Sequence, residues 1–572
     1  MGSRRGAAVA AVVVVGLLVV GVALTVAGAT LLLRHVPRRA MLVVDVAGSL
    51  ADPGPEGPVA ELFSPRRVTR QGLLEGLARA VSDPRIRAVR LRVGDVGAGF
   101  ATVQEIRSLL GKLTVAGKDT AAYLDTVGEF APANREYLLA SACRRIVVGP
   151  LATVNLTGLS ARVPFLRGTL DKLGIEPEFP GIGEFKTARF FYTEKDLTAE
   201  DREMTGWLLA SLRDQLVEQI AASRGLEPAR VRELVAQAPL TAEAALAAGL
   251  VDEIADWQGF VEHSPAGGAE RLEEISLGRY LRAQASVPGA PVVAVVSVRG
   301  AIVRGESGFS PLPVVGGEMA GADTVAEALR AVRDSEAVAA VLRIDSPGGS
   351  AVAAETIRAE VVRTAKQMPV VVSMGDVAAS GGYWIACGAT RLFASPATLT
   401  GSIGVYAGHL AMARFWEEKL GVSWGRVEGD PNADIFASLD PWTPPQRAAV
   451  ERLLQTVYDS FVERVAAARR MSREAVEAVG RGRVFTGAQA VEKGLVDELG
   501  GFEEALAAAK ELAGLDRDQP VQLAFYPRFP SLWERVVQRL VEDREVGALL
   551  RALAAGRLAP PGVVWMPPIA LE

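Results

Sequence analysis

The sequence predicts an α/β protein built from two tandem copies of one domain, preceded by a single transmembrane helix. Short apolar runs alternate with helical patterns in both halves, which indicates strands joined by crossover helices. Similar segments recur at a nearly constant spacing of 245 to 251 residues, which is typical of a duplicated domain. One uncharged apolar run of 27 residues lies near the N-terminus.

That uncharged run covers residues 7–33 and is dominated by Val, Leu and Ala. A helix of this length crosses a bilayer with some tilt, and the run is long for the core of a signal peptide. Small residues near 27–29 leave cleavage open. We therefore expect residues 1–40 to anchor the protein, with no orientation assigned by charge because arginines flank the run on both sides. These are Arg4, Arg5, Arg34, Arg38 and Arg39.

The duplication is visible in three pairs of matching segments. They are residues 79–93 with 330–344, 137–161 with 383–407, and 249–253 with 494–498. A constant offset across half the chain requires two complete copies rather than a shared short motif. We expect the first copy at residues 41–285, the second at 290–515, and a helical, Pro-rich tail at 516–572.

Composition argues against nucleic-acid binding and against a metal centre. The net charge is only −5, and no basic cluster is interleaved with aromatic residues. His35, His263 and His409 are scattered, without carboxylates at a ligand-like spacing. Cys143 and Cys387 form no CxxC pair, so we expect two free, buried thiols, with no metal and no cofactor.

Ser380 lies in a pattern that places one side chain at the end of a sheet. The β-branched run 369–373 predicts a buried strand, and Ser380 is followed by Gly381, Gly382 and a helix-like segment. A strand, a tight turn and a helix start direct backbone N–H groups at whatever the serine contacts. Taken alone, the stretch also fits a serine that only caps a helix. The equivalent position in the first copy is Asn134.

A second glycine loop follows the preceding strand, with the sequence DSPGGS at residues 345–350. Gly348 and Gly349 correspond to Gly97 and Ala98 in the first copy. Such a loop exposes N–H groups that bind an oxyanion or a phosphate. The phosphate interpretation is the weaker one, because neither GxxxxGK[ST] nor GxGxxG occurs here.

A reactive serine needs a base, and lysine is the candidate that stands out. His409 is the alternative in the second copy. A buried lysine loses its proton more readily, whereas arginine keeps its own. Only nine of the 62 basic residues are lysines, and Lys186 lies in an apolar, glycine-flanked stretch, unlike Lys195, which we expect to be solvated. The repeat places Lys186 opposite residues 430–436, which contain no lysine, so one site assembled from both copies is predicted.

Four segments together make the chain resemble the long, two-repeat form of the SppA (protease IV) family of signal peptide peptidases, over roughly residues 41–510. They are DSPGGS, GDVAASGGYWIA, TGSIGV and GEFKTA…YTEKDLT. The resemblance implies a ClpP/crotonase-like fold in each half and a homo-oligomer, a tetramer in the family. It also implies a single-pass protein of the bacterial inner membrane, with its catalytic body on the periplasmic side, that degrades signal peptides.

By the same resemblance, Ser380 is the nucleophile and Lys186 the general base of a serine endopeptidase. The oxyanion hole would use N–H groups of Gly348, Gly349 and Gly381. Two alternatives remain. A crotonase-type acyl-CoA enzyme would use the same paired N–H donors, and an inactive membrane scaffold would keep the fold without the chemistry. Turnover of a peptide but not of an acyl-CoA thioester would exclude the acyl-CoA enzyme. Covalent labelling of the serine would exclude the inactive scaffold.

Overall fold

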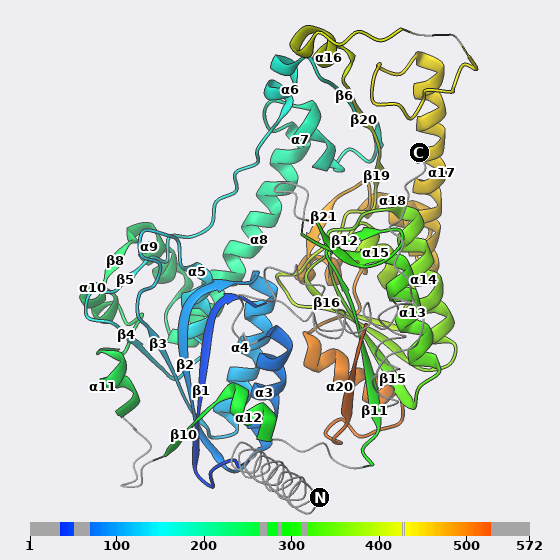
Figure 1. The fold of residues 1–572 in the computed structure, drawn as a ribbon. Helices are drawn as coiled ribbons and strands as arrows, with labels where there is room; N and C mark the ends of the chain where they lie inside the picture. The colour runs from blue at the N-terminus through cyan, green and yellow to red at the C-terminus, as the bar shows by residue number, and fades with distance from the viewer. Residues whose placement is uncertain are drawn as a thin grey trace, which may run out of the picture. The chain divides into compact units, whose positions relative to one another are not determined.

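The computed structural model describes residues 35–50, 69–262, 272–283, 289–310 and 317–527, except 426 and 428. These residues belong to one compact unit (Figure 1). The apolar run at residues 7–33 and the chain from 528 onward, where most of the predicted tail falls, lie outside them. Within the described ranges, no helix combines the length and the apolar character needed to cross a membrane.

The first half is built on a parallel sheet of six strands in the order β10-β1-β2-β3-β4-β9. The central strands β3 and β4 are almost fully buried, whereas β2 and β10 also carry exposed charged residues. The strands are β1 (Ala40–Ser49), β2 (Ile86–Gly97), β3 (Asp119–Leu124), β4 (Arg145–Val148), β9 (Glu253–Ile254) and β10 (Glu273–Ser276). The main helices are α3 (Arg70–Ser82), α4 (Phe100–Val115) and α5 (Asn134–Ala140).

The second half repeats this plan in a sheet of eight strands, with β21-β18-β16-β15-β11-β23 as its main path and β17 pairing with β16 and β22. Its strands are β11 (Val292–Arg299), β15 (Ala337–Ser346), β16 (Val370–Ala379), β17 (Arg391–Ala394), β18 (Leu399–Gly401), β21 (Val484–Thr486), β22 (Glu498–Leu499) and β23 (Gln522–Tyr526). Its main helices are α13 (Ala322–Arg333), α14 (Ala351–Ala365), α15 (Gly381–Ala386) and α20 (Phe502–Leu512). The mixed α/β fold and its duplication are therefore confirmed.

β23 lies in the segment predicted as a tail and adds an edge strand to the second sheet. It pairs in parallel with β11, just as β10 pairs with β1 in the first half. The predicted bounds of the two copies stay a prediction.

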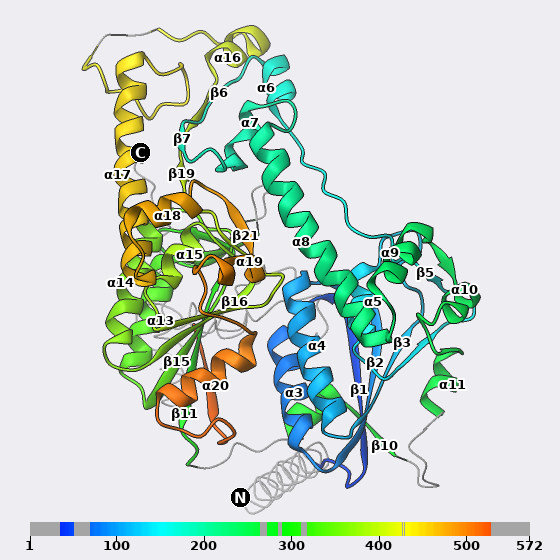
Figure 2. The ribbon, with the colours of Figure 1, turned by 180° about the vertical axis from the view of Figure 1, so that it is seen from behind.

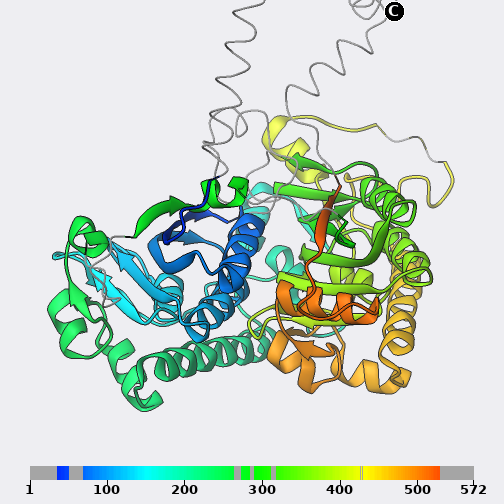
Figure 3. The ribbon, with the colours of Figure 1, turned by 90° about the horizontal axis from the view of Figure 1, so that it is seen from below.

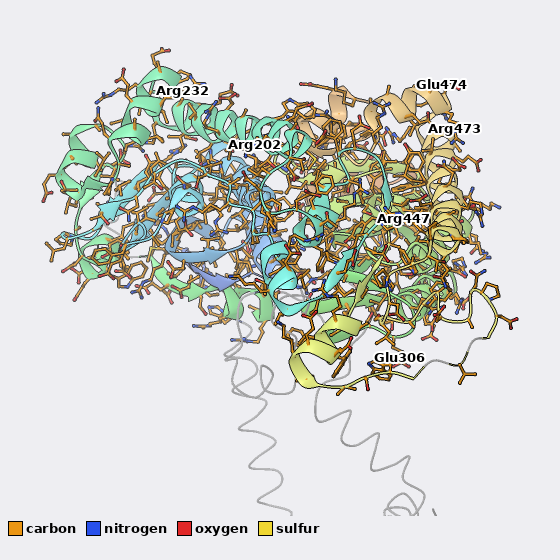
Figure 4. The ribbon with its side chains drawn as sticks, turned by 90° about the horizontal axis from the view of Figure 1, so that it is seen from above. Arg202, Arg232, Glu306, Arg447, Arg473 and Glu474 are labelled. Carbon is orange, nitrogen blue, oxygen red and sulfur yellow. The ribbon has the colours of Figure 1, made fainter. Side chains whose placement is uncertain are left out.

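Two long helices and two small antiparallel ladders join the halves away from the main sheets (Figure 2). The helices are α8 (Ala199–Arg224) and α17 (Pro444–Arg469). They carry exposed charged side chains, such as Arg202 and Arg447 (Figure 4). The ladders pair β6 (Glu176–Glu178) with β20 (His409–Ala411), and β7 (Gly181–Ile182) with β19 (Val405–Tyr406). The segment that contains Lys186 is thus held by strands of the second half.

The remaining elements are short and connect the parts above. In the first half they are β5 (Thr153–Val154), α6 (Arg167–Leu173), η1 (Thr187–Arg189), α7 (Phe190–Thr193), α9 (Pro228–Gln237), β8 (Leu240–Thr241), α10 (Ala242–Ala247), α11 (Trp257–Glu262) and α12 (Leu277–Ala283). In the second half they are β12 (Ala301–Val303), β13 (Gly308–Ser310), β14 (Gly317–Gly321), α16 (Ala413–Leu420), α18 (Arg473–Val479) and α19 (Gly487–Glu492).

The first half is blue to green and the second half yellow-green to orange in Figure 3, and the two halves also meet where α4 lies against β16. A buried ion pair crosses this contact, from Arg343 on β15 to both carboxylate oxygens of Glu105, at 2.6 and 2.8 Å. Burying two charges is favourable only when both are fully hydrogen-bonded, and here the geometry is bidentate. The contact therefore fixes the two halves in one arrangement.

Candidate active site

Ser380 occupies a strained turn between β16 and α15. Its backbone has φ 53° and ψ −116°, a conformation that non-glycine residues rarely adopt. Its N–H donates to the carbonyl of Gly401 at 2.9 Å, which holds the turn in place. Gly382 follows at a point where an added Cβ would lie 3.0 Å from the Ser346 carbonyl. Glycine therefore lets the start of α15 pack closely against the Ser346 carbonyl.

Lys186 reaches Ser380 from the first half. Its Nζ donates to Ser380 Oγ at 2.9 Å, to Ser402 Oγ at 2.8 Å and to the Ser402 carbonyl at 2.9 Å. The residue is 5% exposed, and this burial lowers the pKa of Lys186 to about 7, because a low-dielectric site disfavours the charged ammonium. About half of the molecules therefore carry a neutral lysine near neutral pH.

Ser402 is a site residue that sequence analysis missed. It follows β18, has φ 55°, and offers two of the three acceptors around Lys186 Nζ. The TGSIGV segment contained the signal, because Ser402 aligns with Leu156 in the first copy, as Ser380 aligns with Asn134. A serine lost together with the nucleophile is a candidate for the same site.

The predicted oxyanion glycines lie beside the serine but differ in what their N–H groups do. An added Cβ on Gly348 would lie 2.7 Å from Gly381 N and 2.7 Å from Ser380 Cβ, so the loop touches the start of α15. Gly348 N–H donates to Ser346 Oγ at 3.1 Å and is used within its own loop. Gly349 and Gly381 donate to no acceptor among the described residues. Their N–H groups are therefore available to an external acceptor.

The other predicted residues lie in different environments. The His409 ring stacks on Trp442 at 4.4 Å between centroids and contacts Glu178 at 3.2 Å, so its described partners are all outside the serine turn. Lys195 is a surface lysine paired with Asp171, as predicted. Cys143 and Cys387 are free and buried, also as predicted.

In the first copy, Asn134 replaces the serine and closes its own turn. Its side-chain amide donates to the Gly158 carbonyl at 2.8 Å and accepts from the Gly158 N–H at 2.9 Å. Both polar atoms of the amide are thereby satisfied within the turn. The position that carries Ser380 in the second half is therefore structural in the first.

Comparison with known proteins identifies the family of this chain. Peptidase family S49 matches residues 117–266 and 363–516, once in each half. The chloroplastic serine protease SPPA of Arabidopsis thaliana is 31% identical over 79% of this chain and 67% of its own length. Protease 4 of Haemophilus influenzae is 30% identical over 85% of this chain and 79% of its own. Among solved structures, ClpP1 of Listeria monocytogenes aligns with 37% of this chain and 94% of its own at 17% identity and a TM-score of 0.24. The chain belongs to peptidase family S49, carries the family's domain twice, and is a serine peptidase.

Proposed function

We propose that this protein is a Ser/Lys-dyad endopeptidase that degrades cleaved signal peptides and other apolar, extended peptides. In this proposal, residues 1–40 hold it in the bacterial inner membrane with the catalytic body on the periplasmic side. The observation that carries the proposal is the 2.9 Å hydrogen bond from Lys186 Nζ to Ser380 Oγ. A lysine buried without a carboxylate partner in the described residues has the depressed pKa that a general base requires.

The first half-reaction follows from these contacts. Neutral Lys186 accepts the proton of Ser380 Oγ as the oxygen attacks the carbonyl carbon of the scissile bond. The carbonyl oxygen becomes an oxyanion, which accepts hydrogen bonds from Gly349 N–H and Gly381 N–H. Each well-placed donor of this kind contributes about 3–4 kcal/mol to the transition state. Gly348, the third predicted glycine, shapes the loop, since its N–H already donates to Ser346.

The second half-reaction uses the same groups in reverse. The Lys186 ammonium protonates the leaving amine, which departs and leaves an acyl ester on Ser380. Neutral Lys186 then takes a proton from water as the water oxygen attacks the ester carbonyl, and the Lys186 ammonium returns that proton to Ser380 Oγ as the acid is released. Ser402 keeps Nζ directed at the reacting oxygen through both steps.

We also propose a homo-oligomer, a tetramer by resemblance to the family, of ClpP/crotonase-like repeats. Asp376 and Ala397 lie on the face of the second half that α4 of the first half covers. Their counterparts in the first half, Phe130 and Leu151, are 100% and 97% exposed. Val352 on α14, the counterpart of a buried alanine on α4, is 65% exposed. In the proposed oligomer, α14 of a second copy covers Phe130 and Leu151. This contact would repeat the one that α4 makes with Asp376 and Ala397 within the chain. Head-to-tail contacts of this kind can close into a ring.

The test is covalent labelling of the purified full-length protein in detergent with a serine-directed phosphonate. We expect one modified peptide, containing Ser380, and loss of labelling in Ser380→Ala. Ser472→Ala is the matched control, because Ser472 caps α18 and lies outside the site. The labelled enzyme should lose turnover of a fluorogenic peptide. Unchanged labelling in Ser380→Ala, or turnover of acyl-CoA thioesters in place of peptides, would contradict the proposal.

A further inference from the structure

A four-residue loop at residues 480–483, between α18 and β21, lies directly against the backbone of Lys186. A Cβ added to Gly482 would lie 2.3 Å from Lys186 N and 2.7 Å from Lys186 Cβ. Gly482 also has φ +84°, a conformation that side-chain-bearing residues avoid. No other residue type fits this position without moving Lys186.

The main chain of this loop joins the two segments that hold the dyad. On one side, Phe185 N–H donates to the Arg481 carbonyl at 2.9 Å. On the other, Gly482 N–H donates to the Ile403 carbonyl at 2.7 Å, and Ser402 N–H donates to the Arg483 carbonyl at 2.8 Å. The loop therefore sets the distance between Lys186 and Ser402, which supplies two acceptors for the lysine.

The side chains of the loop are paired with residues of the first half. Arg481 contacts Glu184 at 2.9 Å, and Arg483 contacts Glu203 at 2.5 Å. The Arg483 guanidinium also lies 3.5 Å from the centre of the Phe185 ring, close enough for a cation–π interaction. Glu184 and Glu203 thus pair with the two arginines of the loop, and burial accounts for the lowered pKa of Lys186.

The first copy shows that the fold does not need this loop. Residues 236–238 of the first copy, with the sequence AQA, occupy the positions of residues 481–483. There α9 continues through Gln237, whereas α18 ends at Val479, yet the strands β8 and β21 follow at matching positions. The glycine is absent from the copy that also lacks both site serines. Gly482 therefore occurs in the copy that carries the two site serines, and the fold of the other copy forms without it.

Backbone strain gathers at the same place. Among the described residues, five non-glycine residues have positive φ, and three of them are Ser380, Ser402 and Arg481. Strain of this kind persists where surrounding contacts over-determine the backbone, and it clusters at functional sites. The loop is thus as strained as the turns that carry the two serines.

We propose that the 480–483 loop is the positioning element for the general base, and that Gly482 admits the Lys186 backbone to the place from which Nζ contacts Ser380 and Ser402. This inference rests on the Ser/Lys mechanism proposed above. Gly482 acts through Lys186 and touches no substrate. A side chain at this position would push the lysine segment outward, lengthening the bond to Ser380 and admitting water to Nζ.

The experiment compares Gly482→Ala with Gly494→Ala in the full-length enzyme. Gly494 is the matched control, because it has φ +71° but no atom within 4 Å of an added Cβ, so it shares the backbone cost without the clash. For Gly482→Ala we expect kcat on a fluorogenic peptide to fall about 100-fold, as misplacement by about 1 Å typically does. KM should change less than about twofold, and the midpoint of the acidic limb of the pH–rate profile should rise. Gly494→Ala should change none of these.

Two further variants keep the outcomes distinct. Arg483→Ala fills no space. It removes the ion pair with Glu203 and the contact over Phe185, so it tests the loop even if Gly482→Ala does not fold. We expect it to lower kcat about tenfold and to raise the same midpoint. Wild-type kcat and midpoint in folded Gly482→Ala, or in Arg483→Ala, would overturn the positioning role. Lys186→Met tests the mechanism itself: an active Lys186→Met would remove the dyad proposal, whereas an inactive one beside a normal Arg483→Ala would remove only the loop proposal.

Discussion

In the proposed mechanism, the protonation state of Lys186 controls whether Ser380 is able to react. The amine is surrounded by three oxygen acceptors, which hold its position but supply no negative charge. Burial therefore dominates, and it disfavours the charged form. These are the properties that the proposed mechanism requires of Lys186, namely a base that is available at neutral pH and can still return a proton to a leaving amine.

This charge state predicts the pH dependence. With the pKa of Lys186 at about 7, kcat/KM should rise with pH through that value, since only the neutral amine accepts a proton. The neutral fraction is about a tenth at pH 6 and about nine tenths at pH 8. Lys186→Arg should abolish turnover, because arginine keeps its proton. The surface variant Lys195→Arg should follow the wild-type profile, and a flat profile from pH 5 to 9 would contradict the assignment.

Ser402 should affect rate more than binding. Ser402→Ala removes the hydroxyl acceptor at 2.8 Å but leaves the carbonyl acceptor in place. We expect kcat to fall about tenfold, since Nζ loses part of its orientation, with KM nearly unchanged. Steady-state kinetics on a short peptide give both values. Ser423→Ala, at an exposed position, is the control, and an equal loss there would show that the effect is not specific.

Among single residues, the sequence pointed to Ser380 and Lys186, because each has a counterpart in the other copy that lacks its chemical group. Ser380 and Lys186 stand out because their counterparts are an asparagine and a segment without lysine. Ser402 was missed because a serine in a glycine-containing turn is common for reasons unrelated to catalysis. The engagement of Gly348 N–H with Ser346 was also unpredictable, since it depends on the loop's three-dimensional shape.

Among the elements, α4 is unusual because the other half supplies its N-terminal cap. Its N-cap residue, Gly99, has no side chain to accept the first N–H groups. The Asp376 carboxylate accepts from Gly99 N–H at 3.0 Å, Thr102 N–H at 2.9 Å and Thr102 Oγ at 2.7 Å. A carboxylate at a helix N-terminus satisfies free donors and also interacts favourably with the helix dipole. The strand that leads to Ser380 is thus tied to a helix of the first half.

Asp376→Ala should therefore destabilise the protein. We expect the free energy of unfolding to fall by about 1–3 kcal/mol, the range for leaving buried donors without an acceptor. Denaturant titration followed by circular dichroism measures this. Asp196→Ala is the control, because its carboxylate is 79% exposed, and surface changes of this kind usually lie within about 0.5 kcal/mol. Equal midpoints for the two variants would contradict the capping role.

The elements themselves were largely predictable, and their contacts were not. The run at 369–373 predicted the strand that the structure shows as β16, because a fully buried parallel strand leaves a continuous apolar signature. The cap from Asp376 joins residues 277 positions apart in the chain. No local pattern carries such a contact, so only the folded structure reveals it.

For the whole molecule, the duplication could be predicted from the sequence because three pairs of matching segments keep a nearly constant offset. The contact between the two copies could not be predicted, since the face that α4 covers in the second half carries different residues in the first half. Phe130 and Leu151 show the consequence, as two large apolar side chains left fully open to solvent. We place the proposed contact between copies at these two side chains.

The proposed assembly can be tested on that face. Phe130→Glu combined with Leu151→Glu should disperse the oligomer, because a second copy would have to bury two new charges. Sedimentation velocity in detergent should show a smaller species, with an unchanged circular dichroism spectrum. Val115→Glu is the control, since Val115 is 89% exposed on α4 but lies outside the proposed contact. A size shift equal in both proteins, or in neither, would contradict the proposed surface.

The splitting of the dyad between two halves of one chain also bears on how activity depends on enzyme concentration. Lys186 and Ser380 are 194 residues apart on a single polypeptide, so their effective concentration is set by the fold and is unaffected by dilution. If the two groups came from separate subunits, dilution below the dissociation constant would part base from nucleophile. Here their ratio stays one to one at every concentration. Specific activity on a short peptide should therefore stay constant on dilution. A fall in specific activity would show that the proposed assembly affects how substrate reaches the site.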